Sequence, residues 1–170
     1  MLMIDKMEII KRHQNSAPVD VFAIAKDLGL SVYLFDDWPD DLSGVIAKDS
    51  ESPGGYLIGV NGKHARTRQR FTVAHEIAHF VLHEELIGDG LTEDALYRSR
   101  LSNSIEAQAN RMAADILMPW KLINQVPPPE WSVKDLARRM GVSPSSMAIR
   151  LGVPYETSEN SSDSRKNAAA

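Results

Sequence analysis

Apolar residues fill most of residues 71–83, FTVAHEIAHFVLH, and the polar residues in this segment recur at helical spacing. At about 100° per residue, the polar positions fall on one side of a helix. These positions are Thr72, His75, Glu76, His79 and His83. A surface helix would carry charged residues opposite its apolar stripe, and this segment carries none there. The pattern therefore predicts a buried helix over residues 65–83 with a single polar stripe.

Upstream of this helix, the pattern changes to that of a short helix and short strands. Residues 19–28 have the spacing of a helix that ends at Gly29. Three runs with strand-like alternation follow, at 31–35, 42–49 and 54–61, and turn residues separate them. Three short neighbouring strands predict an antiparallel sheet directly before the buried helix.

A second long helix is predicted over residues 103–118, and its apolar face is interrupted once. That face is formed by Ile105, Ala109, Met112, Ala113, Ile116 and Leu117. Gln108, Arg111 and Asp115 point to the other side, whereas Glu106 falls inside the apolar arc. A carboxylate there needs a strong partner, because burying an unpaired charge is costly.

Downstream of Pro119, which ends the second helix, the pattern predicts a small helical unit. Residues 124–131 are proline-rich and predict an extended linker. Two short helices follow, with Ser132 and Ser143 as N-caps and Gly141 at the turn between them. The predicted fold class is therefore α+β, with a small three-stranded antiparallel sheet packed on the buried helix and further helices, and a C-terminal helical pair.

Composition and charge narrow the class of protein. With 43% hydrophobic and 25% charged residues, the 170-residue chain has the composition of a folded, soluble globular protein. A net charge of −4 argues against a general nucleic-acid-binding surface. No run approaches the roughly 18 apolar residues of a membrane span, and the first residues lack the uninterrupted apolar core of a signal peptide. We therefore expect a cytoplasmic protein that does not enter a membrane.

The polar stripe of the buried helix has the spacing of a metal site. His75 and His79 lie one turn apart, with about 6 Å of rise between them, so both imidazoles can bind one ion. Glu76 can reach a water on that ion without being a ligand. This is the H-E-x-x-H arrangement, with two zinc ligands and a general base. Because the chain has no cysteine, the remaining ligands must be nitrogen or oxygen, a set that manganese or another divalent ion also accepts.

Glu106 is the candidate for the third ligand, because a zinc ion held by two histidines would supply the partner that its carboxylate needs. Alternatively, Glu106 lies at the boundary between the apolar and polar faces of its helix, where its carboxylate reaches water or pairs with an arginine. Four acidic residues in or beside the polar loop after the buried helix are weaker candidates, namely Glu84, Glu85, Glu93 and Asp94. His83 lies about 12 Å along the helix axis from His75, too far to bind the same ion, and we expect it to be packed or to support a ligand.

The stretch RQRFTVAHEIAHFVLH, followed by EAQANRMAADILMP, resembles the ImmA/IrrE family of metallo-endopeptidases. The resemblance extends over residues 19–154. It implies that His75, His79 and Glu106 are the zinc ligands and that Glu76 is the general base, in agreement with the interpretation of the pattern alone.

The same resemblance implies a function, a partner and a domain organisation. It implies a zinc-dependent endopeptidase that cleaves a helix-turn-helix transcriptional repressor and thereby derepresses genes of a mobile element or a stress response. A zincin-like metallopeptidase domain would occupy residues 1–126, a helix-turn-helix-like helical segment residues 127–154, and a disordered, polar tail residues 155–170. Nothing in composition or spacing indicates the repressor, which rests on the resemblance alone.

Peptide hydrolysis would need further groups besides the metal. Glu76 would take a proton from the attacking water and pass it to the leaving amine. The strand at residues 54–61 could receive an extended substrate at its edge by β-augmentation. A second donor to the developing oxyanion is expected, and the candidates are His64, His83, Tyr97 and Arg100.

Two other functions fit parts of the pattern. Residues 132–151 match the spacing of a DNA-binding helix-turn-helix, but the second helix carries a single basic residue, Arg150, so direct nucleic-acid binding is not expected. The other alternative is a zinc-binding module that regulates its partner by contact, without proteolysis. Glu76 favours the enzyme, because a structural zinc usually has four protein ligands and needs no base.

Overall fold

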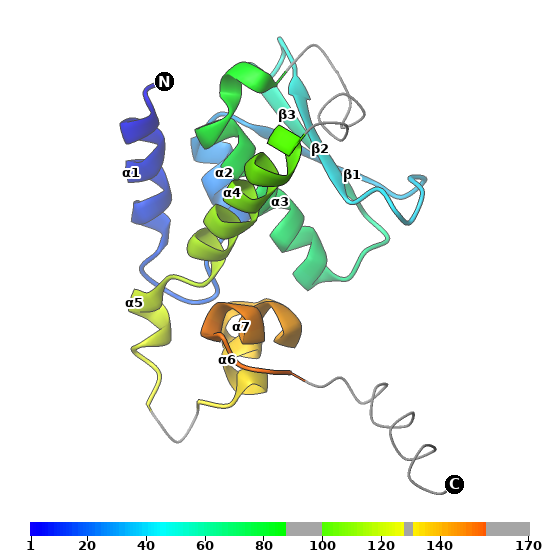
Figure 1. Cartoon of the computed structure of the whole chain (residues 1–170). Coiled ribbons are helices and arrows are strands. Elements are labelled where there is room, and N and C mark those ends of the chain that lie inside the picture. Colours follow the sequence, from blue (N-terminus) through cyan, green and yellow to red (C-terminus); the bar gives the residue numbers. More distant parts are fainter. Residues whose placement is uncertain (88–99, 128–130, 156–170) are drawn as a thin grey trace, which may run out of the picture.

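The computed structural model describes residues 1–87, 100–127 and 131–155 (Figure 1). The helices and strands predicted from the pattern are present, with bounds that differ by a few residues, and the α+β class is confirmed. In chain order the elements are α1 (Met3–His13), α2 (Val21–Asp27), β1 (Ser31–Phe35), β2 (Gly44–Lys48), β3 (Tyr56–Asn61), α3 (Arg66–Leu82), a 3₁₀ turn (Glu84–Leu86), α4 (Arg100–Leu117), α5 (Trp120–Ile123), α6 (Val133–Met140) and α7 (Pro144–Leu151).

The sheet corrects one expectation, because it is mixed and not antiparallel. Its strand order is β1-β3-β2, so β3 lies between the other two strands. β2 pairs with β3 in antiparallel orientation, with Gly44 opposite Val60. β1 pairs with β3 in parallel orientation, with Phe35 opposite Asn61. Strands that are consecutive in sequence, β1 and β2, therefore form the two edges.

The loop between β1 and β2 explains this order. Asn61, the last residue of β3, is fully buried, and its Nδ2 donates to the carbonyl oxygens of Pro39 at 2.9 Å and Leu42 at 2.8 Å. These bonds hold residues 36–43 across the end of β3, so the chain begins β2 on the far side of that strand. The alternation of apolar residues does not indicate such a long-range contact. For this reason the pattern predicted an antiparallel sheet of three consecutive strands.

Helix α3 is the buried helix that the pattern predicted. It packs against α2, β2, β3 and α4, and Figure 1 shows it near the centre of the molecule, between the sheet and α4. Val73, Ala74 and Ile77 are fully buried. The apolar face of α4 covers it from the other side, with Ala109 and Ala113 fully buried. Alanines at this contact allow the two helix backbones to approach closely.

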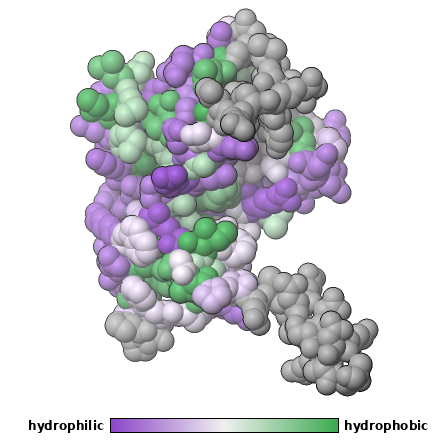
Figure 2. Space-filling model, in the orientation of Figure 1, coloured by the Kyte–Doolittle hydropathy of each residue, from purple (hydrophilic) through white to green (hydrophobic). Residues whose placement is uncertain are grey.

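Helix α1 has no counterpart among the predicted elements. Its buried face includes Lys6, which is only 2% exposed. The Lys6 ammonium donates to the carbonyl oxygen of Phe80 at 2.8 Å and pairs with Glu84 at 2.5 Å. A lysine on the buried face breaks the helical hydrophobic pattern. By contrast, the first four residues are exposed although they are apolar, and Figure 2 shows hydrophobic residues gathered at the N-terminal end of α1, at the upper left.

The C-terminal helical pair forms as predicted. Ser132 and Ser143 cap α6 and α7 by accepting hydrogen bonds from backbone N–H groups three residues later. Gly141 ends α6 with φ of 66°, the left-handed conformation that favours glycine. Leu136, Met140 and Met147 belong to the same hydrophobic cluster as α3 and α4. In Figure 1 the pair lies below the rest of the molecule.

Two arginines, Arg70 and Arg150, attach this pair. Arg70 of α3 donates to the carbonyl oxygens of Gly141 at 2.9 Å and Val19 at 2.8 Å. Arg150 of α7 donates to the carbonyl oxygen of Met118 at 3.1 Å and pairs with Asp115 at 2.7 Å. Arg150, the single basic residue of the second helix of the pair, is therefore bonded to the end of α4 and to the residue that follows it.

The predicted disordered tail lies outside the described residues, apart from Tyr155 at its start, as do residues 128–130 of the predicted linker. Within the described ranges, none of the helices combines the length and the apolar character that crossing a membrane requires.

Candidate metal centre

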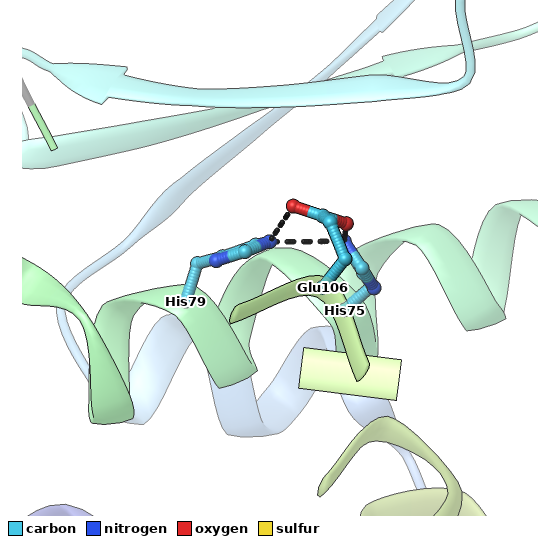
Figure 3. Close-up of side chains that lie close together, drawn as sticks. All are labelled: His75, His79 and Glu106. Atoms are coloured by element: carbon cyan, nitrogen blue, oxygen red, sulfur yellow. Dashed lines mark hydrogen bonds and ion pairs between the residues drawn. The ribbon is translucent and has the colours of Figure 1, made fainter. Parts of the chain in front are cut away.

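Three side chains from two helices converge on one point (Figure 3). His75 and His79 come from α3, and Glu106 comes from α4, which packs against it. The Nε2 atoms of the two histidines are 3.0 Å apart. Glu106 places one carboxylate oxygen 3.2 Å from Nε2 of His75 and the other 3.3 Å from Nε2 of His79. The predicted third ligand therefore meets the two histidines, while 42% of its side chain stays exposed.

These separations suit a small tetrahedral ion. Zinc binds histidine nitrogen and carboxylate oxygen at about 2.0–2.2 Å, so ligand atoms around one tetrahedral ion lie about 3.3 Å from one another. The observed separations of 3.0, 3.2 and 3.3 Å are close to that value. Two neutral nitrogens and one carboxylate oxygen form a donor set typical of catalytic zinc sites. The three residues can therefore hold a divalent metal ion and leave a coordination position open.

The electrostatics of the cluster follow from its geometry. Hydrogen bonds from His75 and His79 hold the pKa of Glu106 far below its ordinary value, although its partial burial acts in the opposite direction. Burial opposes the charged form of His75, but the hydrogen bond to Glu106 and the negative charges of Glu76 and Glu106 outweigh it and raise the His75 pKa. The site thus favours positive charge at its centre, which is the charge a metal ion brings.

Glu76 lies beside this cluster but outside it. It is 6% exposed, and its carboxylate charge acts on His75. One of its oxygens faces Gly44, at 3.3 Å from the position that a Cβ atom would take there. Glu76 therefore lies between the metal-binding side chains and the start of β2. A buried carboxylate next to the expected ion, without being one of its ligands, is suited to accept and return a proton.

The Nδ1 atoms of both histidines have partners, and of these the sequence analysis named only His83. Nδ1 of His75 lies 3.0 Å from Oδ1 of Asn110, an acceptor that keeps the proton on Nδ1 and the lone pair on Nε2. Asn110 follows Glu106 by four residues on the same face of α4, so helical spacing would have indicated it.

His79 is supported by the third histidine of the stripe. Its Nδ1 lies 3.3 Å from Nδ1 of His83, and Nε2 of His83 lies 3.4 Å from Oε1 of Gln108. His83 is 6% exposed, and burial lowers its pKa, so it stays neutral and can accept from His79 while donating to Gln108. Of its two expected roles, the contact with a ligand is the one observed. Gln108 had been assigned only to the polar side of its helix.

The other candidates lie elsewhere or outside the described residues. Glu84 pairs with Lys6, and Glu85 is exposed next to it. His64 contacts the carbonyl oxygen of Asp40 at 3.0 Å, in the loop that crosses the sheet. Glu93, Asp94, Tyr97 and the side chain of Arg100 lie outside the residues that the structure describes.

Three comparisons with known proteins bear on this arrangement. Residues 20–152 match the model of the IrrE N-terminal-like domain. The radiation response metalloprotease IrrE of Deinococcus deserti is 37% identical over 105 residues, which are 58% of this chain and 37% of that protein. The protein of the same name from Deinococcus radiodurans is 38% identical over 105 residues, again 58% of this chain and 31% of that protein. The aligned region thus spans about a third of the length of these relatives.

A solved structure described as a Mycobacterium tuberculosis transcriptional regulator superposes on this chain with a TM-score of 0.60 and 15% sequence identity. The superposition covers 92% of this chain and 48% of that one. At this level of identity, the likeness shows a shared fold and nothing about activity.

Proposed function

Because this chain belongs to the ImmA/IrrE family, through the match of residues 20–152 to the IrrE N-terminal-like domain, we propose that it is a zinc-dependent endopeptidase. His75, His79 and Glu106 are the proposed ligands and Glu76 the proposed general base. The observation that carries the proposal is the convergence of two imidazole nitrogens and a carboxylate within 3.3 Å of one another, beside a second, buried carboxylate. Manganese or another divalent ion would fit the same donors.

The proposed chemistry divides between the ion and the protein. Zinc, when bound, lowers the pKa of water toward neutrality and polarises the scissile carbonyl group. Glu76 accepts a proton from the attacking water and delivers it to the leaving amine. Asn110 and His83 keep the ring protons of His75 and His79 away from the ion. The oxyanion donor remains unassigned among the described side chains, since His64 and His83 both have other partners.

The proposed substrate path follows β2 and not β3. β3 was the strand expected to receive an extended peptide, but it is central and pairs on both sides. Within the described ranges, β2 pairs on one side only, and it packs against α3, with Gly44 beside Glu76. A peptide that adds to this edge in extended form would run along α3 past the metal centre.

The proposed substrate is a helix-turn-helix transcriptional repressor, and the proposed location is the cytoplasm. Both rest on membership of the family and on nothing in the geometry of the site. Division into a metallopeptidase domain (1–126), a helical segment (127–154) and a tail (155–170) is likewise a proposal. Membership of α6 and α7 in the common hydrophobic cluster indicates that the first two of these parts fold together.

The alternatives have less support. DNA binding through residues 132–151 would need Arg150. The guanidinium group of Arg150 pairs with Asp115, and only 12% of the Arg150 side chain is exposed. Regulation by contact alone would give no use to the position of the Glu76 carboxylate, which lies beside the cluster and faces the start of β2.

The test begins with metal analysis. Protein purified without added metal should contain about one zinc per chain, and Glu106→Ala should lose most of it because an open site needs its third ligand. Glu85→Ala, an exposed glutamate outside the site, is the matched control and should keep the metal. Absence of metal from the wild type after zinc is supplied would reject the proposed centre.

Catalysis is then tested separately from binding. Wild-type protein and Glu76→Gln are each incubated with a proteome-derived peptide library and with purified helix-turn-helix repressors, and new peptide termini are counted by mass spectrometry. Glu76→Gln should retain zinc and lose cleavage. A metal-loaded wild type that cuts nothing in either set, while binding a repressor, would instead support regulation by contact.

A further inference from the structure

β1 forms one edge of the sheet. Among the residues that the structure describes, it pairs with β3 on one side only, and its sequence, SVYLF, contains no charge and no proline. Tyr33, Leu34 and Phe35 are 49%, 52% and 36% exposed. Proteins usually protect such edges with charged residues, proline or a covering segment, because a bare apolar edge pairs with another strand. We therefore expect another β-strand to pair with the free edge of β1.

The backbone groups that face outward can be identified. In a parallel pair, successive residues of a strand direct their N–H and C=O groups alternately to the two sides. The carbonyl oxygen of Phe35 accepts from Gly62 at 2.9 Å, on the β3 side. Val32 and Leu34 therefore direct their groups to the free edge. The N–H of Leu30, the next position in this series, is already bonded to Ala25 at 2.9 Å.

A pocket of about 500 Å³ opens beside this edge, between α2 and β1. Its apolar lining includes Phe22, Leu30, Val32 and Pro53, and Lys26 adds a charge. Val32 and Leu34 project to the same face of the sheet as Ile58 and Val60, to which they are paired. Tyr33, on the opposite face, also lines the pocket, so the pocket follows the strand edge, where it can accept an aliphatic side chain.

We propose that the occupant is β1 of a second copy of this chain, paired in antiparallel orientation about a two-fold axis at Tyr33. In this register Val32 of each copy lies opposite Leu34 of the other. Both residues direct their backbone groups outward, so both pairs become hydrogen-bonded pairs and every outward group on β1 is used. The edge is complementary to itself, as a two-fold symmetric interface requires.

Side chains fit the same register. Leu34 of the second copy, opposite Val32 and on the same face, enters the pocket beside α2. Tyr33 and Phe35 of the two copies meet on the other face, where Phe35 stacks on Trp38 with ring centroids 4.7 Å apart. Together these contacts bury the apolar side chains that are exposed in one copy.

Charge supports a second copy over an unrelated strand. Antiparallel pairing brings the C-terminal end of one β1, with Asp37, to the N-terminal end of the other, where Lys26 borders the pocket. In the part of the chain that the structure describes, neither side chain has an interaction within its own copy. The dimer would form one six-stranded sheet with the β2 edges, and hence the two metal centres, at its outer ends.

The first test is sedimentation velocity of the full chain over a range of concentrations from below to well above about 1 µM. The 18.9-kDa chain should form a reversible dimer. Leu34→Lys, at a half-exposed position, should raise the dissociation constant at least tenfold while circular dichroism stays unchanged. Lys26→Glu should weaken the dimer, and adding Asp37→Lys should restore it. Ile149→Lys, exposed on α7, is the control and should change nothing.

The second test uses the absence of cysteine from the chain. Tyr33→Cys places one thiol in each copy at the two-fold axis, as a non-hydrogen-bonded pair whose Cα atoms lie about 4.5 Å apart, within reach of a disulfide. Mild oxidation should convert this variant to a covalent dimer many times faster than Ser50→Cys, which exposes a thiol in the β2–β3 turn.

The outcomes are decisive in both directions. Concentration-dependent dimers that respond to Leu34 and Lys26, with selective crosslinking at position 33, support the proposal. A monomer at all concentrations, a dimer indifferent to these substitutions, or equal crosslinking of the two cysteine variants overturns it. Protection of Val32 and Leu34 amides from hydrogen exchange in a monomer would show that another segment of this chain covers the edge, which also overturns the proposal. Loss of the proposed peptidase activity has no bearing on any of these readouts.

Discussion

At the scale of single residues, a histidine can hold a metal only if one ring nitrogen offers a lone pair and the other keeps the proton. Asn110 can enforce this for His75 because its Oδ1 only accepts. His83 does so for His79 because it is buried and bonded through its second nitrogen to Gln108. The polar stripe that appears redundant in sequence therefore contains both ligands and their support.

Removing the support for His75 should weaken metal binding without removing a ligand. Asn110→Ala is expected to raise the zinc dissociation constant about 10- to 100-fold, the usual effect of losing a residue that orients a ligand. Competition against a chromogenic chelator measures it. Asn103→Ala, an exposed asparagine on the same helix, should leave the constant unchanged. Equal affinity in both variants would mean that Asn110 does not orient His75.

At the scale of elements, two close approaches set the position of the site. β2 lies against α3 where Gly44 faces Thr72, and a Cβ atom on Gly44 would stand 2.2 Å from Cγ2 of Thr72. α6 ends against α3 where Gly141 faces Arg70. Neither glycine is marked as a contact by the pattern of apolar residues, since a glycine has no side chain to contribute to that pattern.

The contact between β2 and α3 can be tested by a compensating pair. Gly44→Ala should destabilise the protein by about 1–3 kcal/mol, because the added methyl group overpacks the contact. Thr72→Ser removes the methyl group that it meets, so the double variant should recover most of the loss. Urea unfolding of the two single variants and the double variant gives the coupling energy, and simple additivity would contradict the predicted contact.

The turn between α6 and α7 offers a second matched pair. Gly141→Ala and Gly152→Ala both place a side chain on a left-handed residue, with φ of 66° and 68°, which costs about 1–2 kcal/mol. Only at Gly141 would the new Cβ also approach Arg70 Nε, at 3.0 Å, whereas Gly152 faces open space. Gly141→Ala should therefore lower the free energy of unfolding further than Gly152→Ala, and equal losses would exclude a packing contribution.

At the scale of the whole molecule, Arg70 joins three segments that are far apart in sequence. It is 8% exposed and bonds to the carbonyl oxygens of Val19, before α2, and of Gly141, after α6. α3, which carries the two histidines proposed to bind the metal, is thereby fixed to the C-terminal helical pair. The family match over residues 20–152 includes both of these parts.

Arg70→Met should lower the free energy of unfolding by about 2–4 kcal/mol, because two buried carbonyl oxygens lose their donor while the aliphatic stem is kept. Chemical denaturation measures this loss. Arg68→Met, two residues earlier and exposed, removes a single bond to Ser43 and should cost less than about 1 kcal/mol. Similar values for the two variants would argue that Arg70 is not the attachment point.

The amino-acid sequence by itself indicated most residues of the candidate metal centre and most of the local elements. A helix has 3.6 residues per turn, so the sequence alone predicts that His75 and His79 are adjacent and that Glu106 falls within an apolar face. The residue types at Ser132 and Ser143 likewise predict the two helix caps. What depends on contacts between distant segments was decided only by the tertiary structure. The place of β3 between β1 and β2 depends on the hydrogen bonds that Asn61 makes to the loop between those strands. The packing of α1 depends on Lys6, which is buried against Phe80. The orientation of Arg150 depends on its ion pair with Asp115. Periodicity reports which face of an element is buried, but not which other element buries it.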